Sequence, residues 1–426
     1  MESNRPTFAA YWRLLRGNRN FRRLWLAQIV SEIGDWFYIL AIYSLLLELT
    51  GKAQSVGIAV VLQVLPSTLV GPMAGVVNDR ISRRRVMIAA DLIRMVIVSG
   101  MMLVRSRQTV WMVYPLLFFE TVMWGFFEPA RSAVIPNVVG ETDVLTANTV
   151  SSITWSVNFA IGSGLGGLVA VLLGRDAVFV LNALSFLASA LLIGGMHFHE
   201  PHAAGTAPFR ARELVDFSPI ADGVRYIRKD ARLFATVLLK GGVGVLGANW
   251  VIFPIMGQRV FPVRLAGLDA ARGAVLGMSL LMGARGLGAL IGPLAASSWA
   301  GGRGSRMRAG ILVAFLAGAI GYMALAGAPS LALACVGVVV AHGGGSVVWV
   351  FSTTLLQRYA DDKFRGRVFA ADLGFCMLTI AVTSFLASVA IDSGIGVRTV
   401  AFSTGVAMLL PVGAWFWALR LWREKN

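Results

Sequence analysis

Ionisable side chains stand inside several long apolar stretches of this sequence. Glu32 and Asp35 share one stretch, three residues apart, and Glu120 stands in another, all in the first half of the chain. Lys240 and Arg285 stand in apolar stretches of the second half. At the centre of a bilayer such a group costs about 3 kcal/mol or more unless it faces water or a partner. These five residues are therefore the candidates for proton exchange and for charge contacts between the two halves.

The acids of the first half are the expected proton acceptors. Burial favours a protonated carboxyl group and a nearby cation favours the ionised form, so a carboxyl group under both influences can titrate near neutral pH. We expect Asp35, with Glu120 second, to take up a proton and thereby change its interaction with Lys240 or Arg285. For Glu32, a permanently ionised structural bridge is the alternative.

Asp91 and Arg94 form a further charged pair within one apolar stretch. Their separation of three residues places them on the same face of a helix. We expect a structural pair in which each side chain masks the charge of the other.

The composition indicates a membrane protein. Hydrophobic residues make up 57% of the chain, charged residues make up 14%, and the mean hydropathy is +0.71, whereas soluble domains carry about 25% charged residues. Cys335 and Cys376 both lie inside apolar stretches, so neither a disulfide, a metal site nor a cofactor is expected. The sequence shows no nucleophile–base spacing and no phosphate-binding loop that would indicate an enzyme.

Twelve apolar segments are long enough to cross a bilayer, which requires about 20 residues in a helix. Lipid offers no hydrogen-bond partners to the backbone, so we expect each segment to be helical and the fold to be an all-α membrane fold. The expected transmembrane helices are 24–49, 54–78, 86–104, 109–130, 146–173, 176–197, 233–257, 272–299, 308–327, 330–356, 368–392 and 398–420.

The positive charge of the chain carries topological information. The formal net charge is +16, but the arginines lie in short clusters between apolar segments rather than along one soluble face, which argues against a nucleic-acid partner. Lys and Arg are concentrated in the loops on the side of the N-terminus, and by the positive-inside rule this side faces the cytoplasm. An even number of helices then places both termini in the cytoplasm, and the first helix is expected to be retained.

A long connection at residues 199–232 divides six segments from six. We expect an N-terminal six-helix bundle at 1–198 and a C-terminal six-helix bundle at 233–426, with an amphipathic helix on the membrane surface between them. The motif GPMA at 71–74 has a counterpart, GPLA, at 292–295. This internal repeat predicts that the two bundles are related by pseudo-symmetry.

The connection between the second and third segments resembles the loop signature of the major facilitator superfamily. It reads GVVNDRISRRR at 75–85, with Ser82 at the place of the usual glycine. The matching residues are Gly75, Asp79, Arg80, Arg83 and Arg84. The resemblance implies a secondary transporter in which this motif is a conformational latch between helices two and eleven, with Asp372 as a further member. Ala300 occupies the corresponding place in the second half, so Asp79 is expected to matter for switching and Ala300 is not.

Other stretches resemble one branch of the superfamily, which contains macrolide efflux pumps, the enterobactin exporter and the lysophospholipid transporter. They are FEPAR at 127–131 and RGRV at 365–368. In the fifth helix, GSGLGG at 162–167 resembles the end of the antiporter motif and favours export; close helix packing alone is the alternative. The glycines of this helix-packing motif are Gly162, Gly166 and Gly167.

The resemblance also selects candidate substrate contacts, because helices one, four, seven and ten line the central cavity in this superfamily. They are Trp36, Trp124, Asn249, Trp250, His342 and Trp349. Aromatic walls with a few polar groups suit a bulky amphipathic molecule. The alternatives are tryptophans at the lipid interface and a histidine that is hydrogen-bonded within the helices.

These features together predict a secondary active transporter of the bacterial cytoplasmic (inner) membrane that acts as a monomer. We expect proton-coupled efflux, by antiport and alternating access, of a bulky amphipathic compound: a drug such as a macrolide, with drug resistance as the result, or a siderophore. Transport of a lysophospholipid is the alternative, because the cationic second half can hold a phosphate group. A membrane scaffold or sensor without transport activity is a third interpretation.

Overall fold

The computed structural model describes residues 8–140, 143–200, 218–301 and 303–423. Within these ranges the protein consists of sixteen α-helices and short 3-10 turns, with no β-strand. Twelve helical segments are long and apolar enough to cross a bilayer. The predicted all-α membrane fold with twelve transmembrane helices is therefore confirmed.

The first half of the chain contributes seven helices, six of which belong to membrane-spanning segments. They are α1 (Phe8–Gly17), α2 (Arg19–Thr50), α3 (Ala53–Arg80), α4 (Arg83–Gly100), α5 (Val113–Val139), α6 (Val144–Leu173) and α7 (Arg175–Gly194). The 3-10 turns Met101–Leu103 and Val110–Met112 extend the third and fourth segments.

The second half contributes nine described helices. They are α8 (Ser218–Lys229), α9 (Ala231–Val245), α10 (Asn249–Arg259), α11 (Ala270–Ala300), α12 (Gly304–Gly327), α13 (Leu331–Tyr359), α14 (Asp362–Asp392), α15 (Val397–Ala407) and α16 (Leu409–Arg423). The 3-10 turn Leu246–Ala248 interrupts the seventh segment between α9 and α10. Four glycines within 241–247 precede or occupy this break, and glycine lowers the stability of a helix interior.

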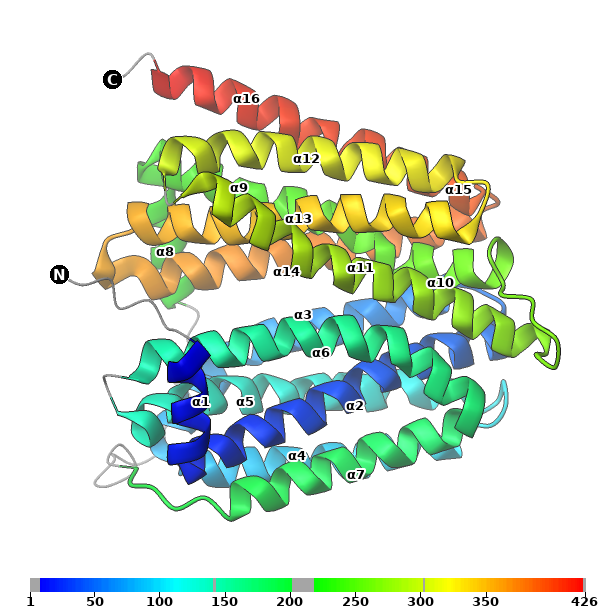
Figure 1. Ribbon diagram of the computed structural model, residues 1–426, viewed down its shortest axis with the longest axis horizontal. Coiled ribbons are helices and arrows are strands. Elements are labelled where there is room, and N and C mark those ends of the chain that lie inside the picture. The colour runs from blue at the N-terminus through cyan, green and yellow to red at the C-terminus, as the bar shows by residue number, and fades with distance from the viewer. Residues whose placement is uncertain (1–7, 141–142, 201–217, 302, 424–426) are drawn as a thin grey trace.

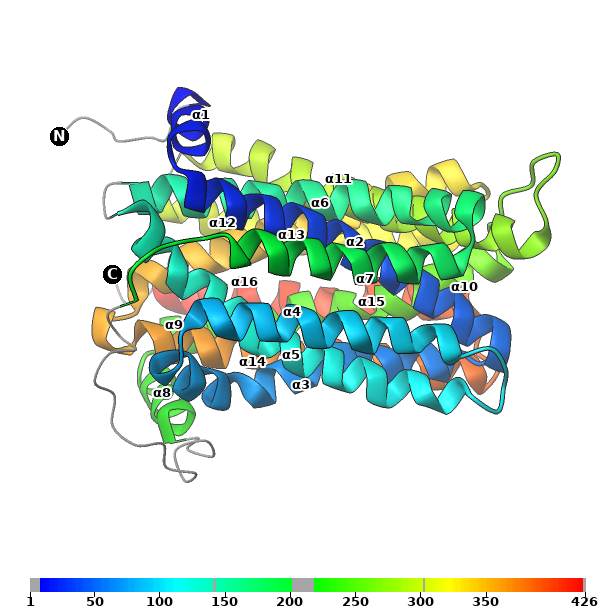
Figure 2. The same ribbon diagram turned by 90° about the horizontal axis from the view of Figure 1, so that it is seen from below.

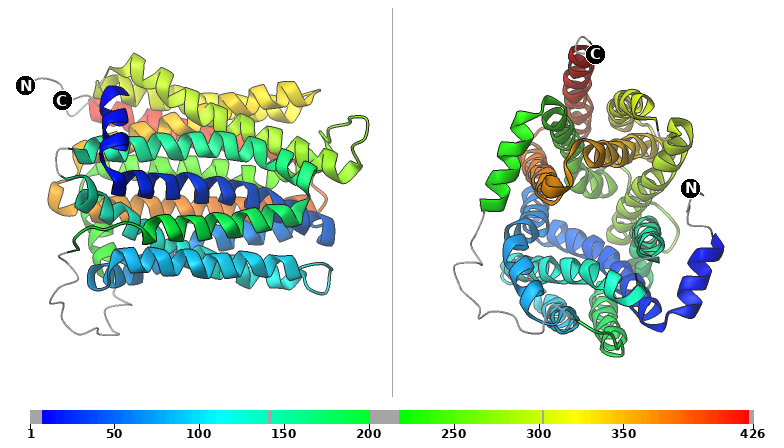
Figure 3. Two further views of the ribbon diagram at one scale, coloured as in Figure 1. Left: turned by 60° about the horizontal axis from the view of Figure 1, so that its bottom comes forward. Right: turned by 90° about the vertical axis from the view of Figure 1, so that its left-hand side faces the viewer.

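The spanning helices form two groups that lie side by side (Figure 1). One group comprises α2 to α7, and the other comprises α9 to α16. Both chain termini lie at the same end of the molecule, which we call the terminal face; the opposite end is the far face. Seen end-on from the terminal face, the two groups are separate clusters of helices (Figure 3).

Helices α1 and α8 lie at the terminal face and run across the spanning helices (Figure 2). Tyr226 of α8 stacks on Phe364 of α14 with ring centroids 4.3 Å apart, and Asp222 pairs with Arg367 at 3.5 Å. The second half therefore holds α8 against its own surface. The predicted amphipathic helix corresponds to α8, although residues 201–217 of the connection lie outside the described ranges.

The charged motif at 75–85 is mostly helical. α3 ends at Arg80 and α4 begins at Arg83, so only two residues connect them. Ser82 is one of these, and its Oγ accepts a hydrogen bond from the backbone N–H of Arg85 at 3.3 Å. This N-cap allows α4 to begin at Arg83 rather than at the predicted residue 86. The two helices thus extend further into the motif than the predicted bounds of 54–78 and 86–104.

Helices α6 and α11 pack together along a seam between the two halves. The Oγ of Ser279 on α11 accepts a hydrogen bond from the backbone N–H of Gly167 at 3.1 Å and lies 2.9 Å from the carbonyl oxygen of Ser163. A Cβ atom on Gly167 would collide with Ser279. Gly162 and Gly166 instead allow α6 to approach α2 in its own half. The glycine motif thus serves both the first bundle and the seam.

A second contact between the halves closes the far face on the side of α3 and α14. Asp392, the last residue of α14, accepts hydrogen bonds from the backbone N–H groups of Ala53 at 2.8 Å and Gln54 at 2.7 Å. These are the first two residues of α3, whose N–H groups have no partner within the helix. A carboxylate of one half thus caps a helix of the other.

Removal of this cap should favour opening of the far face. Replacing Asp392 by Ala deletes both acceptors, and we expect it to shift the equilibrium toward the open far face by about 1 kcal/mol, or about fivefold. Asp392→Asn, which retains one acceptor, should shift it less. Spin labels at Gln108 and Leu265, on opposite halves at the far face, report the change as a longer distance distribution. An unchanged distribution in Asp392→Ala would show that the cap does not hold this face closed.

Candidate functional site

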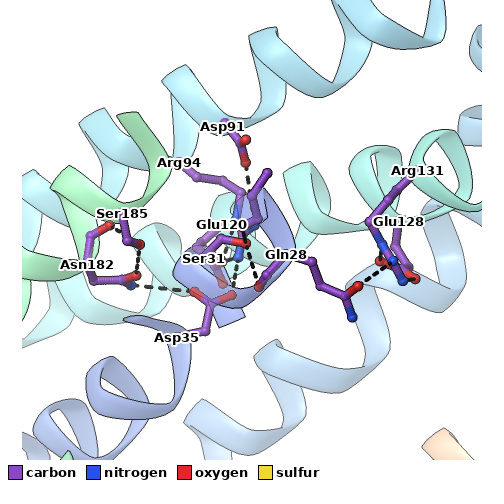
Figure 4. A network of polar contacts seen from close by, with 11 residues as sticks. Gln28, Ser31, Asp35, Asp91, Arg94, Glu120, Glu128, Arg131, Asn182 and Ser185 are labelled. Atoms are coloured by element: carbon purple, nitrogen blue, oxygen red, sulfur yellow. Dashed lines mark hydrogen bonds and ion pairs between the residues drawn. The ribbon is translucent and has the colours of Figure 1, made fainter. Parts of the chain in front are cut away.

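Arg94 of α4 joins acids from two other helices inside the first half (Figure 4). Its Nη2 lies 2.8 Å from Asp35 Oδ2 on α2 and 2.7 Å from Glu120 Oε1 on α5. Its Nε donates to the same oxygen of Glu120 at 2.9 Å. The Arg94 side chain is only 3% exposed. Ionised partners make short, strong hydrogen bonds, and in buried surroundings the loss of one partner is costly.

The surroundings of Arg94 add a third acid and an aromatic ring. Asp91, one turn earlier on α4, places Oδ1 4.0 Å from Nη1 of Arg94. The ring of Phe186 on α7 lies 4.0 Å from the guanidinium carbon, a cation–π contact. The guanidinium group is therefore surrounded by three carboxyl groups and one apolar face.

Helix α7 also holds Asp35 in place. The amide nitrogen of Asn182 donates to Asp35 Oδ1 at 3.5 Å, and Ser185 Oγ donates to Asn182 Oδ1 at 3.1 Å, which orients the amide. A Cβ atom on Gly34 would collide with Asn182 and Ser185. Glycine at this position of α2 is thus what allows α7 to reach the carboxyl group next to it.

The partners of the predicted proton acceptors differ from the prediction. We expected Asp35 and Glu120 to face Lys240 or Arg285 of the second half, but in this conformation both acids pair with Arg94 of their own half. The reason is that α2, α5 and α4 converge within one bundle, whereas the basic residues of the second half are engaged elsewhere. Arg94, which we assigned to a structural pair within α4, is the centre of the cluster.

Glu32 belongs to a separate polar network nearer the terminal face. Its two carboxyl oxygens accept hydrogen bonds from the side-chain amides of Gln28 at 2.9 Å and Asn158 at 2.8 Å. Gln28 in turn accepts from Arg131 Nη1 at 3.1 Å, and Arg131 pairs with Glu128 at 2.5 Å (Figure 4). Glu32 is thus held by amide donors, and the network ties α2 to α5 and α6.

Lys240 of α9 forms a buried ion pair in the second half. Its Nζ lies 3.2 Å from Asp372 Oδ2 on α14 and donates to Thr353 Oγ1 on α13 at 3.0 Å. The ring of Trp349 lies 3.7 Å from the ammonium nitrogen. Asp372 was predicted to join the latch beside Asp79, but it is only 3% exposed and bound inside its own half in this conformation.

Arg285 of α11 lies at the seam among aromatic rings from both halves. Its Cζ is 4.1 Å from the ring centroid of Trp250 on α10 and 4.7 Å from that of Phe159 on α6. Trp36 of α2 lies parallel to Trp250, with centroids 6.3 Å apart, and Tyr43 of α2 meets Trp250 edge-on at 6.3 Å. Two predicted substrate contacts and one predicted coupling residue are therefore brought together here.

The other predicted substrate contacts are not among the rings that stack around Arg285. Asn249 is buried and donates to the backbone carbonyl of Leu246, next to the break between α9 and α10. His342 is buried and lies 3.3 Å from the hydroxyl of Tyr322. Trp124 is exposed on α5. The described contacts of the first two are thus with their own half.

The arginines of the charged motif at 75–85 donate to backbone carbonyl groups of α5 and α7 in their own half. Asp79 is 76% exposed and lies 3.7 Å from Arg83 Nη2. Arg83 donates to the backbone carbonyl of Ala133 on α5 at 3.0 Å, and Arg84 donates to that of Gly194 at the end of α7. Cations at helix C-termini are favourable because the last carbonyl groups there lack partners. The latch between the halves stays a prediction.

The described residues contain no group of three or more His, Cys, Asp or Glu side chains arranged to hold a metal ion, and Cys335 and Cys376 are free thiols. The chemistry offered by the site is the binding of a proton at carboxyl groups and the recognition of a molecule by aromatic rings and a guanidinium group.

Sequence reasoning missed the role of Arg94 and the contribution of Phe159. A count of charges could have found the first, because the apolar stretches of the first half hold more acids than bases and Arg94 stands in the helix between the acids. Phe159 stands three residues before the glycine motif of α6, but no periodicity distinguishes it from a lipid-facing ring. Its position at the seam follows only from the packing of α6 on α11.

The sequence profile of the Major Facilitator Superfamily matches residues 24–371. The chain therefore belongs to this family of membrane transporters, and the predicted family is confirmed.

Curated relatives are similar to parts of the chain or to most of it. An uncharacterised transporter of this family, YfiS from Bacillus subtilis (strain 168), is 27% identical over 42% of this chain and 43% of its own length. Macrolide efflux protein A from Streptococcus pyogenes is 28% identical over 64% of this chain and 65% of its own length. The putative bacilysin exporter BacE from Bacillus amyloliquefaciens is 23% identical over 87% of this chain and 88% of its own length. The chain thus spans about half to two thirds of the first two relatives.

Solved structures share the fold. The nucleoside transporter NupG superposes with a TM-score of 0.69 at 14% identity, covering 94% of this chain and 99% of its own. A bacterial homologue of the human lysosomal transporter Spinster, in an inward-facing and unoccupied conformation, gives a TM-score of 0.67 at 14% identity, covering 96% and 98%. At this level of identity the likeness concerns the fold alone.

Loss of Arg94 should destabilise the protein strongly. Arg94→Ala leaves the buried carboxyl groups of Glu120 and Asp91, and the partly exposed one of Asp35, without a cation. We expect a loss of about 3–5 kcal/mol in the free energy of unfolding. Asp35→Asn with Glu120→Gln in the same chain should recover part of the loss. The measurement is unfolding in detergent.

The matched control is Arg105→Ala, because Arg105 pairs with Asp176 at 2.6 Å while 60% exposed. Removal of the Arg105 side chain should lower the free energy of unfolding by less than about 1 kcal/mol. Equal stability of the Arg94 and Arg105 variants would show that the buried cluster does not hold α2, α4 and α5 together.

Proposed function

We propose that this protein is a proton-coupled exporter of a bulky amphipathic compound in the bacterial cytoplasmic membrane, with both termini in the cytoplasm. The observation that carries the proposal is the convergence of three carboxyl groups, of which those of Asp91 and Glu120 are buried, on the single guanidinium group of Arg94. Fully ionised, the cluster would hold three negative charges and one positive charge. Such an excess is unfavourable in apolar surroundings, so the cluster favours the binding of a proton.

Asp35 is the acid that we assign to proton exchange. Carboxyl groups that share a cation titrate as a unit, but exchange with solvent also requires access to water. The side chain of Asp35 is 24% exposed, whereas Glu120 is 11% exposed and Asp91 is fully buried. We therefore assign proton entry to Asp35, with Glu120, which contacts the same guanidinium group, as the second candidate.

The proton site is joined to the aromatic group at the seam through the backbone of α2. Asp35 contacts Arg94 within the first half, and the next residue, Trp36, stacks on Trp250 of the second half. Neighbouring residues of a helix point about 100° apart. Binding of a proton to Asp35 would weaken the contact between Arg94 and α2. The backbone of α2 would then transmit this change to the ring stack between the halves.

The direction of transport rests on topology and on the relatives. Basic residues gather at the terminal face, so we assign this face to the cytoplasm. The seam and the Asp392 cap close the far face, which makes this conformation closed toward the outside. Relatives named as a macrolide efflux protein and a putative bacilysin exporter support export of a bulky compound rather than uptake.

Replacing Asp35 by Asn should abolish proton-driven export and leave a folded protein. The amide cannot exchange a proton, but it can still accept a hydrogen bond from Arg94. We would measure efflux from energised cells for a panel of amphipathic fluorescent dyes and a macrolide, with and without a protonophore.

Asp176→Asn is the matched control, because Asp176 lies at the far face in an exposed pair. It should export as the wild type does. Full protonophore-sensitive export by Asp35→Asn would exclude Asp35 as the coupling residue.

A further inference from the structure

Arg285 differs in its partners from Arg94 and Lys240, two buried basic residues. Arg94 and Lys240 each pair with a carboxylate, whereas the described contacts of Arg285 are with the faces of aromatic rings. Its Nη1 is buried and makes no hydrogen bond to the described residues. An aromatic face attracts a cation but accepts no conventional N–H bond in the plane of the guanidinium group. The hydrogen-bonding edge of Arg285 is therefore left without an acceptor among the described residues.

The groups around Arg285 supply no negative charge. The titratable side chains near it are Tyr43, Tyr322 and His342. A tyrosine is ordinarily neutral at physiological pH, and a histidine is neutral or positive. The carboxyl groups of Asp35 and Glu120 pair with Arg94 instead. In the middle of a membrane protein, a guanidinium group without a counter-ion is costly, so the site is incomplete without an anion.

The rings around Arg285 define the rest of a binding site. Trp250 and Phe159 stack on the guanidinium group from the two halves, and Trp36 continues the stack at 6.3 Å from Trp250. Trp155 lies 6.3 Å from Trp36 and 5.7 Å from Phe159. These rings form an apolar wall beside one polar group, as is typical of sites for amphipathic molecules.

We propose that the guanidinium group of Arg285 binds the anionic group of the transported compound, so that the substrate is an amphipathic anion with a carboxylate or phosphate group beside a bulky apolar body. This proposal rests on the proposed transport function and names its substrate class. The planar fork of an arginine matches two oxygens of a carboxylate or phosphate. A cationic substrate would instead meet a like charge next to the tryptophans.

The location of Arg285 gives the bound anion a role in switching. Arg285 lies near the middle of α11, between Gly283 and Gly286, which closely approach α6 of the other half. A ligand on Arg285 therefore lies where the halves meet, in contact with rings from both. Its binding neutralises the charge at the seam as the two halves separate.

The test compares four probes that share one aromatic body: pyrenebutyrate, pyrenebutyl phosphate, pyrenebutanol and pyrenebutylamine. The purified protein in nanodiscs transfers excitation energy from tryptophan to a bound pyrene, and empty nanodiscs give the background. We expect at least one of the two anions to bind about tenfold more tightly than the alcohol and the amine, because a charge-assisted pair contributes that much. The butyrate and phosphate arms distinguish a carboxylate substrate from a phosphate substrate.

Variants of Arg285 identify the site. Arg285→Gln should remove the preference for anions, and Arg285→Lys, which keeps the charge without the planar fork, should retain part of it. Arg306→Gln is the matched control, because Arg306 is an exposed arginine near Trp299 of the same half. Tighter binding of the amine or alcohol by the wild type, or an unchanged preference for anions in Arg285→Gln, would overturn the proposal. If Arg285→Gln does not fold, Arg285→Lys provides the test. Binding of all four probes by Arg285→Lys with the affinities of the wild type would contradict the proposed anion site.

Failure of this proposal and failure of the transport proposal give different results. Asp35→Asn should still prefer the anionic probes, because Asp35 does not contact Arg285. Proton-driven efflux of cationic compounds only would refute the anion site and leave the transporter intact. Anion preference at Arg285 without proton-sensitive efflux would refute the coupling mechanism and leave the site intact.

Discussion

The structure depends on one constraint, which is that a charge inside a bilayer must have a partner. Arg94 meets this constraint through ion pairs with two carboxyl groups, which link α2 and α5 to α4. Lys240 meets it with Asp372 and thereby joins α9 to α14. In lipid there is little hydrophobic gain from packing one apolar helix on another. These buried polar contacts therefore contribute to which helices are neighbours as well as to what the protein can bind.

The contacts between the two halves are built from different chemistry. Along α6 and α11 they include small residues and hydroxyl groups that are hydrogen-bonded to the backbone. At the far face the described contacts include one carboxylate on a helix N-terminus and a hydrogen bond from Arg259 to the carbonyl oxygen of Gly51. Each of these contacts is weak compared with the ion pairs inside the bundles. Separation of the two halves would therefore leave the charged clusters within them intact, which is compatible with the alternating access expected from the sequence.

Much of the fold could be predicted from the sequence, because it follows from the lengths of apolar segments. The resemblance at 75–85 indicates the family from the residue types alone, although most of that motif lies in the end of α3 and the start of α4. The pairing of the charged side chains was harder to predict. No spacing in the sequence singles out one base as the partner of Asp35, and only the packing of α7 against both α2 and α4 brings Arg94 next to it.

The residues at the seam show the same limit. Trp36, Trp250 and Arg285 were each identified from their type and position, but their assembly into one group could not be predicted. That assembly depends on the close approach of α6 and α11, which is set by backbone geometry at the glycines. The sequence pattern of small residues indicates that an approach occurs, yet it does not indicate which helix is approached.

Three consecutive residues of α2 face three different neighbours. Gly34 admits α7, Asp35 reaches Arg94 of α4, and Trp36 lies against Gly162 of α6 and the ring of Trp250. At 100° per residue these contacts cover most of the circumference of one helical turn. α2 therefore has no freedom to turn about its own axis at this depth. A displacement of α2 that begins at Asp35 would therefore tilt the first bundle as one unit.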